Sequence, residues 1–469
     1  NLLGKNFNNQ STFKNIPKTT IKYIMNSRRR FLHNSGSFAI GVMGLQALSL
    51  SGKANQSHPG YGKLIRDPQG VLDLPQNFDY KIIGRTGDLM SDELLLPGKP
   101  DGMATFPATN PEEVILVRNH EIDPGASSKE GPFGKKNSKL KDIQEDLIYD
   151  KGKSTPCLGG TTTAVYNVKT QEMVRQFLSL TGTVRNCAGG PTPWGTWITC
   201  EETIVRAGGQ FRQDHGWCFE VPVTETPKLN QPIPLKAMGR FNHEAVAVDP
   251  DSGEVFLTED RHESLLYKFV AKEPGNLSKG GKLFALAVVN SPSLDTRNWK
   301  SQKVHVGQEM ELEWIEMDEV DSPKDDLRFR GFQKGAACFA RGEGMWYSDG
   351  SIYFACTNGG KKQNGQIWQI SGNKLKLFSE PNDSDLVDNC DNITVAPWGD
   401  LVLCEDGGGE QYLDVITPSG KIFKLAKNAK SSGEFAGATF SPDGSTLFVN
   451  MQHDGLTLAI TGPWEAKLG

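Results

Sequence analysis

The sequence repeats one short pattern six times, and this repeat limits the possible folds more than any other feature. Each copy begins at or beside an acidic, amide or thiol residue and continues as a short strand, a turn rich in Pro, Gly and Asp, and a second alternating strand that ends at another polar residue. These turns predict β-hairpins, because Gly, Pro and Asp supply the backbone angles that tight turns require. The copies are Asp101–Glu121, Cys187–Glu202, Glu244–Asp260, Glu343–Asn358, Asp391–Asp406 and Glu434–Asn450.

Two copies share the turn Pro-Trp-Gly, at 193–195 and 397–399. Most of the turns are spaced near the length of one propeller blade, roughly 40–50 residues. The sequence therefore predicts an all-β fold, a six-bladed β-propeller with loop insertions and a few short helices. We expect residues 56–469 to form this single domain, with 125–156 as a mobile surface loop and 297–330 as a short helix or an exposed excursion.

The two open ends of a hairpin lie at the same edge, opposite the turn. If the six hairpins are inner hairpins of blades, their polar ends face one mouth of a central channel. Asp101, Glu259 and Asp391 fall at this edge beside the candidate ligands. So many carboxylates cannot share a mouth without cations, which predicts a polynuclear metal site. The candidate ligands are Glu121, Cys187, Glu201, Glu202, Glu244, Asp260, Glu343, Glu405, Asp406 and Glu434.

Cys187 stands at a strand start where other copies carry an acid or its neighbouring amide. A thiolate among carboxylates suits a borderline transition metal such as iron better than calcium or magnesium, whereas the oxygen-rich remainder favours calcium. The alternative is a small buried residue, because free cysteine is common in protein cores.

Arg341 lies two residues before Glu343 and would project to the same side if the chain there is extended. An arginine beside a metal cluster is a good bidentate clamp for a phosphate oxyanion. The alternative is a salt bridge that only orders the carboxylates. His120 and His243 each precede a candidate ligand and are either outer-sphere partners of the metal or structural residues.

The formal net charge of −5 gives no reason to expect nucleic acid or an anionic membrane as a partner. The eight cysteines form no C-x-x-C pair, so zinc ribbons and thioredoxin-like redox sites are not expected. No G-x-S-x-G motif is present to support a serine hydrolase.

The N-terminal region contains S-R-R-R-F-L-H at 27–33, followed by an apolar run at 38–50 that is too short to span a bilayer. It resembles a twin-arginine export signal. We therefore expect residues 1–55 to be an extension and signal peptide, with Met25 as the start of translation. The expected product is a periplasmic or extracellular monomer, delivered by the twin-arginine export machinery, with no stable membrane span in the mature chain. The alternative is a basic tail before a surface helix.

Several long motifs resemble those of the PhoX-type alkaline phosphatases, over about residues 85 to 465. They are V-R-N-H-E at 117–121, R-N-C-A-G-G-P-T-P-W-G-T-W-I-T-C-E-E at 185–202, F-N-H-E-A-V-A-V-D-P at 241–250, R-G-E-G at 341–344, D-N-I-T-V-A-P-W-G-D-L-V-L-C-E-D-G at 391–407 and E-F-A-G-A-T-F-S-P-D-G at 434–444.

The resemblance implies a six-bladed propeller that hydrolyses phosphate monoesters with an iron pair and calcium ions in its mouth. It implies that Cys187 is a thiolate shared by the irons, with Glu244 and Glu343 as further iron ligands, and that Arg341 holds the phosphate. These four would be the catalytic residues. The implied calcium ligands are Glu202, Asp260, Glu405, Asp406 and Glu434.

Two other classes of protein fit the repeat and the acidic mouth. One is a propeller lactonase or esterase that uses calcium alone, and the other is a non-enzymatic binding propeller stiffened by calcium. Metal content, measured beside a phosphomonoester assay, distinguishes the three.

Overall fold

The computed structural model describes residues 60–464, so the predicted signal peptide at 1–55 lies outside the described residues. Within this range the chain is almost entirely β-structure, with one short α-helix and five 3₁₀ helices. The helices are η1 (Lys135–Asn137), η2 (Leu140–Asp142), η3 (Glu145–Leu147), η4 (Lys236–Met238), η5 (Leu277–Lys279) and α2 (Leu327–Gln333). No helix in residues 60–464 combines the length and hydropathy that a membrane crossing requires.

All six predicted hairpins are present, and each is antiparallel. Their turns use the predicted glycines, since Gly195 and Gly399 in the two Pro-Trp-Gly turns have φ of 82° and 97°, a region that favours glycine. The hairpins are β4 (Pro100–Pro107) with β5 (Glu113–His120), β8 (Asn186–Pro191) with β9 (Thr196–Glu201), β11 (His243–Val248) with β12 (Val255–Glu259), β16 (Gly342–Ser348) with β17 (Ser351–Cys356), β20 (Cys390–Val395) with β21 (Leu401–Glu405), and β24 (Phe435–Phe440) with β25 (Thr446–Met451).

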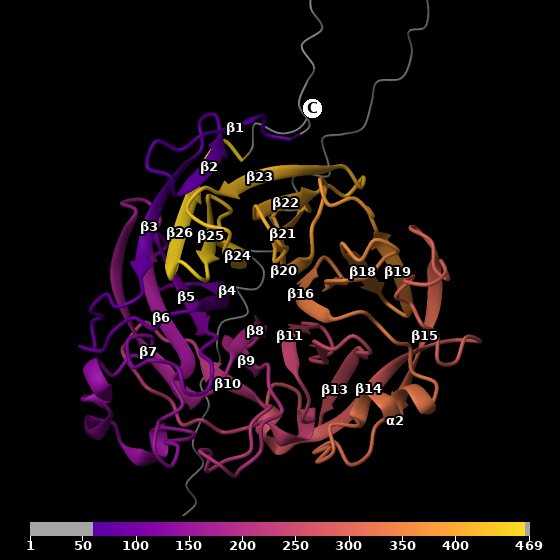
Figure 1. The fold of residues 1–469 in the computed structure, drawn as a ribbon, viewed down its shortest axis with the longest axis horizontal. Coiled ribbons are helices and arrows are strands. Elements are labelled where there is room, and N and C mark those ends of the chain that lie inside the picture. The colour runs from indigo at the N-terminus through magenta and orange to yellow at the C-terminus, as the bar shows by residue number, and fades with distance from the viewer. Residues whose placement is uncertain (1–59, 465–469) are drawn as a thin grey trace, which may run out of the picture. The chain divides into compact units, whose positions relative to one another are not determined.

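The first strands of these hairpins are neighbours in a closed ring, in the order β4, β8, β11, β16, β20, β24 and back to β4. Figure 1 shows these strands near the centre and the sheets following one another around it in chain order. The arrangement is propeller-like. The outer strands are β6 (Gly159–Asn167), β7 (Glu172–Thr183), β10 (Cys218–Pro222), β13 (Tyr267–Ala271), β14 (Gly281–Val288), β18 (Gln366–Ser371), β19 (Lys374–Ser379), β22 (Tyr412–Ile416), β23 (Ile422–Asn428) and β26 (Leu456–Thr461).

The two insertions are more ordered than the sequence suggests. In the segment 125–156, Phe133 and Asp150 are buried, so the prediction of a mobile surface loop is wrong for these parts. In the segment 297–330, β15 (Glu309–Glu316) pairs with both β14 and β19. This strand joins two four-stranded meanders into one nine-stranded sheet, a long-range pairing that local sequence does not reveal.

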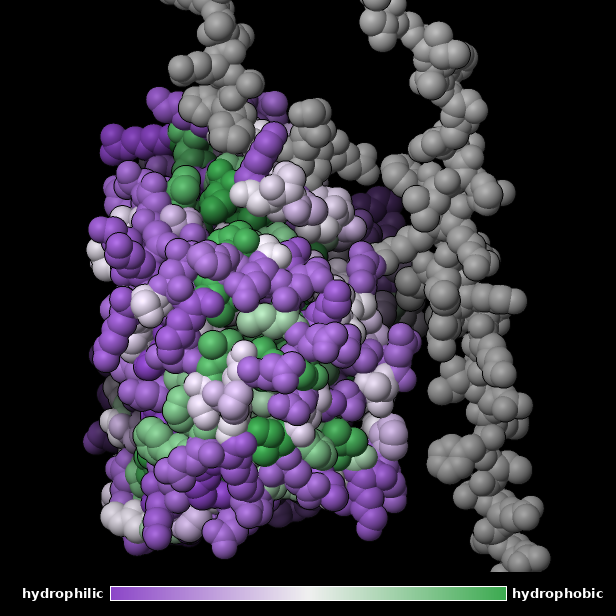
Figure 2. Space-filling view, turned by 90° about the vertical axis from the view of Figure 1, so that its right-hand side faces the viewer, coloured by the Kyte–Doolittle hydropathy of each residue, from purple (hydrophilic) through white to green (hydrophobic). Residues whose placement is uncertain are grey.

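Strands from the N-terminal part of the described chain complete two C-terminal sheets. β3 (Asp79–Arg85) pairs with β26, and β2 (Leu72–Pro75), which pairs with β1 (Leu64–Ile65), also pairs with β23. Figure 1 shows the indigo β3 beside the yellow β26. Apolar side chains pack between neighbouring sheets, as in the cluster that contains Leu413, Leu447 and Leu458. On the face shown in Figure 2, hydrophobic residues are interrupted by hydrophilic ones.

The pairing of β26 with β3 can be tested with Leu458→Ala, because Leu458 is fully buried and its register partner is Ile82. We expect unfolding free energy to fall by about 2–5 kcal/mol, the usual cost of deleting a buried leucine side chain. Urea denaturation measures it. The control Ile233→Ala removes an exposed side chain and should change stability by less than about 0.5 kcal/mol. Equal losses of unfolding free energy for Leu458→Ala and Ile233→Ala would contradict the pairing of β26 with β3.

Candidate metal centre

The open ends of the hairpins surround a cavity of about 370 Å³. Ten carboxylates and one thiol line it, against three cationic side chains, those of Lys99, Arg185 and Arg341. Eight of the ten predicted ligands are present there: Glu121, Cys187, Glu202, Glu244, Asp260, Glu343, Asp406 and Glu434. The other three carboxylates are those of Asp101, Asp123 and Asp391.

Five cavity side chains occupy one repeated position, at the start of an inner strand. In each of these hairpins the register shifts directly after the first residue pair, which is the signature of a β-bulge. A bulge re-aims the side chain that it contains, here towards the cavity. The five residues are Asp101, Cys187, Glu244, Glu343 and Asp391. Cys187 therefore occupies the position that an acid fills in four other hairpins.

Small residues after the bulge let neighbouring inner strands meet. A Cβ atom on Gly102 would lie 2.6 Å from Ala188 Cα, and one on Gly344 would lie 2.6 Å from Asn392 Cα. Neither position has room for a larger side chain, because the obstructing atoms belong to the backbone. This contact keeps the ring narrow and brings the five bulge side chains together.

The residue that follows the second strand also faces the cavity in most hairpins. Glu121, Glu202, Asp260 and Asp406 occupy this position. The strand residue just before it points to the opposite side, because successive side chains of a strand alternate. Of two adjacent acids at the end of a second strand, such as Glu201 and Glu202, only the second therefore lines the cavity.

Glu201 and Glu405 were predicted as ligands, and the structure does not bring either into the cavity. Glu201 is fully buried and binds His215 Nδ1 at 2.6 Å, and it accepts hydrogen bonds from backbone N–H groups. Glu405 binds Lys424 Nζ at 2.8 Å and likewise accepts backbone hydrogen bonds. The structure therefore places Glu201 and Glu405 outside the cavity. Because successive side chains of a strand alternate in direction, the next residues, Glu202 and Asp406, line it instead.

His120 is also turned away from the cavity. Its Nδ1 lies 2.9 Å from Gly98 O and its Nε2 lies 2.9 Å from Thr162 Oγ1, so both ring nitrogens are already used. This histidine has a structural role in the first sheet.

The third repeated position lies two residues before the bulge residue and carries the cations. Lys99, Arg185 and Arg341 occupy it, each with φ of 48°, in the left-handed region that non-glycine residues seldom adopt. Such strained conformations persist only where surrounding contacts stabilise them, and they are frequent at functional sites. In the sixth hairpin the register shifts only after Ala436, which pairs with Asn450, and the acid that lines the cavity is Glu434, directly before β24.

The two arginines differ in what they leave free. Arg185 directs Nε and both terminal nitrogens at acceptors, which are Glu202, Asp123 and Glu121. Arg341 makes a bidentate contact with Asp260, at 2.7 and 2.9 Å, and donates from Nη2 to Glu343 Oε1 at 2.9 Å. Within residues 60–464, no group accepts a hydrogen bond from Arg341 Nη1. The prediction that Arg341 and Glu343 share one side is confirmed, although the chain there is not extended.

The electrostatics of the cavity are unfavourable for carboxylates alone. Burial, and next the neighbouring carboxylates, raise the pKa of Asp101, Glu244 and Glu343 well above the ordinary value. Burial and Asp406 raise the pKa of Asp391 to about 7. Burial, followed by Asp101, raises the pKa of the Cys187 thiol.

The residues fit a set of bound cations. The cavity contains three groups of three potential ligands, and within each group the ligand atoms lie within 4.8 Å of one another. The groups share members: Asp101 with Glu121 and Cys187, Cys187 with Glu202 and Glu244, and Glu244 with Glu343 and Asp391. Both carboxylate oxygens of Glu244 are buried and find no hydrogen-bond partner within residues 60–464. A buried ionised group normally has partners, and metal coordination would supply them here.

Sequence reasoning placed Asp101 and Asp391 at this edge but did not rank them among the ligands. It missed Arg185, although its spacing from Cys187 is that of Arg341 from Glu343. It also missed Gln452, which donates hydrogen bonds to Asp101 Oδ2 at 2.7 Å and Glu121 Oε2 at 2.8 Å. Gln452 is the residue after β25, so the hairpin position itself was the available signal.

The fold and the cavity define a propeller-like protein with groups of candidate metal ligands at its centre. The chain belongs to the PhoX alkaline phosphatase family, because residues 59–455 match the family described as "Alkaline phosphatase PhoX". Members of this family are metal-dependent, in agreement with the ligand groups of the cavity.

Several solved structures align with most of this chain at low identity and low TM-score. A gluconolactonase from Xanthomonas campestris is 11% identical, with coverage of 82% of this chain and 98% of that chain and a TM-score of 0.37. A putative 6-phosphogluconolactonase from Bacteroides uniformis is 11% identical, with coverage of 74% and 76% and a TM-score of 0.34. At these scores the likenesses carry no argument about function. A comparison with curated protein sequences finds no match.

The raised pKa values predict how the metal-free protein responds to pH. Burial raises the pKa of Glu202 from 4.5 to about 8, with Arg185 opposing and Glu121 adding to the shift. The unfolded carboxyl ionises near pH 4.5 while the folded one keeps its proton, so this group destabilises the fold progressively as pH rises through this window. We expect the Tm of chelated protein to fall from about pH 5 to about pH 8, measured by scanning calorimetry.

The matched variant is Glu202→Gln, which removes the titrating group and should reduce the slope of Tm against pH. Bound cations should reduce it as well, because they replace the proton. If Glu202→Gln leaves the slope of Tm against pH unchanged, the Glu202 carboxyl is not the cause of the pH-dependent loss of stability.

Proposed function

We propose that this protein is an exported alkaline phosphatase that hydrolyses phosphate monoesters at an iron and calcium cluster and releases inorganic phosphate. Family membership supports the phosphatase activity. The observation that carries the metal cluster is the cavity itself, in which ten carboxylates and a thiol face three cations and neither oxygen of Glu244 has a hydrogen-bond partner among residues 60–464.

We further propose that the six hairpins are the inner strands of six propeller blades. The closed ring of their first strands supports this count. The described sheets number five because β15 merges the strands of two blades into one sheet. Residues 56–469 would then form one catalytic domain.

The ligand groups support a division of metals by ligand type. Cys187, Glu244 and Glu343 would hold the iron pair, because a thiolate suits a borderline transition metal. The oxygen-only ligands would hold calcium, which prefers several carboxylate oxygens. These are Glu121, Glu202, Asp260, Asp406 and Glu434, with Asp101 and Asp391 as further candidates. When bound, the cations would supply Lewis-acid activation of the phosphoryl group and neutralise the carboxylates.

Arg341 is the residue of this chain best placed to hold the substrate. Its contacts with Asp260 and Glu343 fix the guanidinium, and its side chain remains 28% exposed. No group in the described part of the chain accepts a hydrogen bond from Nη1, which can therefore donate to a phosphoryl oxygen, an interaction that would strengthen as charge develops in the transition state. Arg185 is less suitable, because its donors are already directed at carboxylates and a carbonyl.

The proposed location is the periplasm or the exterior of the cell, reached by the twin-arginine export machinery as a monomer. The arginine motif at 27–33 supports the route. Export of folded protein by this route would allow the cluster to be inserted first.

The function is tested on wild-type protein and Cys187→Ala, each purified without chelator. We expect wild-type protein to contain iron and calcium and to hydrolyse p-nitrophenyl phosphate. Cys187→Ala should lose iron and lower kcat/KM for this substrate by at least about 10²-fold, because the thiolate is the ligand that selects iron. Elemental analysis and initial rates measure both.

Cys404→Ala is the matched control, since Cys404 is also buried but lies outside the cavity. It should keep iron and activity. An active Cys187→Ala enzyme without iron would overturn the proposal. Calcium alone with hydrolysis of a lactone would favour the lactonase class, and metal without turnover of any ester would favour a binding propeller.

Replacement of Arg341 tests the phosphate clamp separately. We expect Arg341→Ala to keep its metals and to lower kcat/KM by about 10²–10³-fold, a typical cost of removing a donor to a developing oxyanion. Arg341→Lys keeps the charge but not the planar fork, so it should recover only part of the loss. The control Arg297→Ala breaks an ion pair with Asp295 outside the cavity and should leave kinetics unchanged. Loss of metal together with activity would favour a role limited to ordering the carboxylates.

A further inference from the structure

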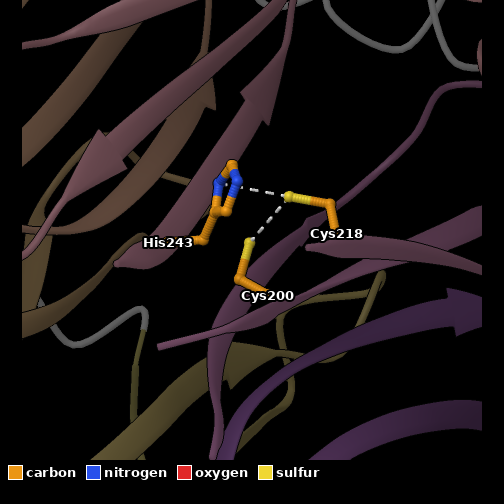
Figure 3. Close-up of side chains that lie close together, drawn as sticks. All are labelled: Cys200, Cys218 and His243. Atoms are coloured by element: carbon orange, nitrogen blue, oxygen red, sulfur yellow. Dashed lines mark hydrogen bonds between the residues drawn. The ribbon is translucent and has the colours of Figure 1, made fainter. Parts of the chain in front are cut away.

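A second set of metal-ligating side chains lies apart from the cavity. Cys200 on β9, Cys218 on β10 and His243 on β11 converge on one point, as Figure 3 shows. All three are fully buried, and none of them lines the cavity. Cys200 and Cys218 are register partners on adjacent antiparallel strands, while His243 comes from the next hairpin in the ring.

The spacing of the three donor atoms matches a tetrahedral metal site. Cys200 Sγ lies 3.7 Å from Cys218 Sγ, and Cys218 Sγ lies 3.3 Å from His243 Nδ1. With metal–sulfur bonds of about 2.3 Å and a metal–nitrogen bond of about 2.0 Å, tetrahedral angles separate two sulfurs by about 3.8 Å and sulfur from nitrogen by about 3.5 Å. A small adjustment of side chains therefore places all three atoms on one zinc ion.

The hydrogen bonding of His243 selects the tautomer that a metal needs. His243 Nε2 lies 2.9 Å from Gly239 O, and a carbonyl oxygen only accepts, so Nε2 carries the ring proton. Nδ1 then presents its lone pair towards the thiols. A histidine that binds metal usually donates its other N–H group to a carbonyl or carboxylate in this way. The Phe241 ring lies against the imidazole at a centroid distance of 3.6 Å with an interplanar angle of 31°, which restricts its orientation.

The other histidine and cysteine group of the fold lacks this feature. His215 lies between Glu201 at 2.6 Å and Asp150 at 3.2 Å, one carboxylate on each ring nitrogen. Cys157 is a further hydrogen-bond partner of His215, and neither ring nitrogen keeps a free lone pair for a metal. The contrast identifies the Cys200, Cys218 and His243 group as the one prepared for a metal.

We propose that Cys200, Cys218 and His243 bind one zinc ion, at a site separate from the catalytic cavity. Two thiolates and a neutral imidazole make a complex with Zn²⁺ that carries no net charge, which lowers the cost of placing the ion in apolar surroundings. Thiolate ligands favour zinc over calcium and magnesium. Three protein donors leave one coordination position for a small ligand, as in zinc sites that are not closed by a fourth side chain.

The zinc site connects two neighbouring hairpins and positions their cavity residues. Cys200 lies two residues before Glu202, and His243 directly precedes Glu244. A metal bond between β9, β10 and β11 therefore fixes the backbone that carries two of the ligands grouped with Cys187. The ion acts as a structural cross-link and takes no part in the reaction.

The experiment is elemental analysis of the purified full chain, produced with zinc in the medium and dialysed against zinc-free buffer. We expect one zinc per wild-type chain and less than about a tenth of this in Cys200→Ala and Cys218→Ala, since each loses a thiolate. Cys187→Ala should keep its zinc, which separates this site from the cavity and from the proposed phosphatase activity. Cys404→Ala, the buried control, should keep it as well. Wild-type protein without zinc, or zinc lost only from Cys187→Ala, overturns the proposal.

Two measurements on wild-type protein keep the test valid if a variant fails to fold. X-ray absorption at the zinc edge should show two sulfur neighbours and at least one nitrogen neighbour. Thiol titration of denatured, chelated protein should find all eight cysteines reactive. Two fewer thiols, together with absence of zinc, would indicate a disulfide between Cys200 and Cys218 and would overturn the zinc assignment. Copper at this position would overturn it as well.

Discussion

The bulge at the start of the inner strands is the constraint on which the cavity depends. A regular ladder would send alternate side chains to the two faces of each sheet. The bulge turns Asp101, Cys187, Glu244, Glu343 and Asp391 towards one centre, and the glycines at 102 and 344 let the strands carrying them touch. The large apolar interfaces between sheets hold this arrangement against the repulsion among the carboxylates.

The same charge distribution connects metal binding with catalysis. A phosphate ester is an anion, and ten carboxylates would repel it from a cavity with only three cationic side chains. Bound cations would reverse this balance and would displace the protons that the raised pKa values retain. Arg341 would take part in both states, because its ion pairs order Asp260 and Glu343 while its side chain remains partly exposed. Metal loading and substrate affinity are therefore expected to rise together with pH.

The sequence predicted what is local and repeated, and failed where side-chain direction or distant pairing decides. The hairpins followed from turn residues such as the glycines of the two Pro-Trp-Gly turns. The choice between Glu201 and Glu202, or Glu405 and Asp406, depended on a shift of one residue along the second strand, where successive side chains point to opposite sides. The bridging strand β15 needed long-range pairing. The group of Cys200, Cys218 and His243 was invisible as a motif, because its members lie on three strands and only the sheet register joins them.

We propose that the bulge residues form a metal-binding centre with iron at the Cys187 thiol. Anomalous X-ray scattering at the iron edge, from crystals of protein purified without chelator, tests it most directly. We expect anomalous peaks within bonding distance of Cys187 Sγ and the carboxylates of Glu244 and Glu343. Crystals of the active enzyme with no iron peak in this cavity, or with iron bound elsewhere, would contradict it.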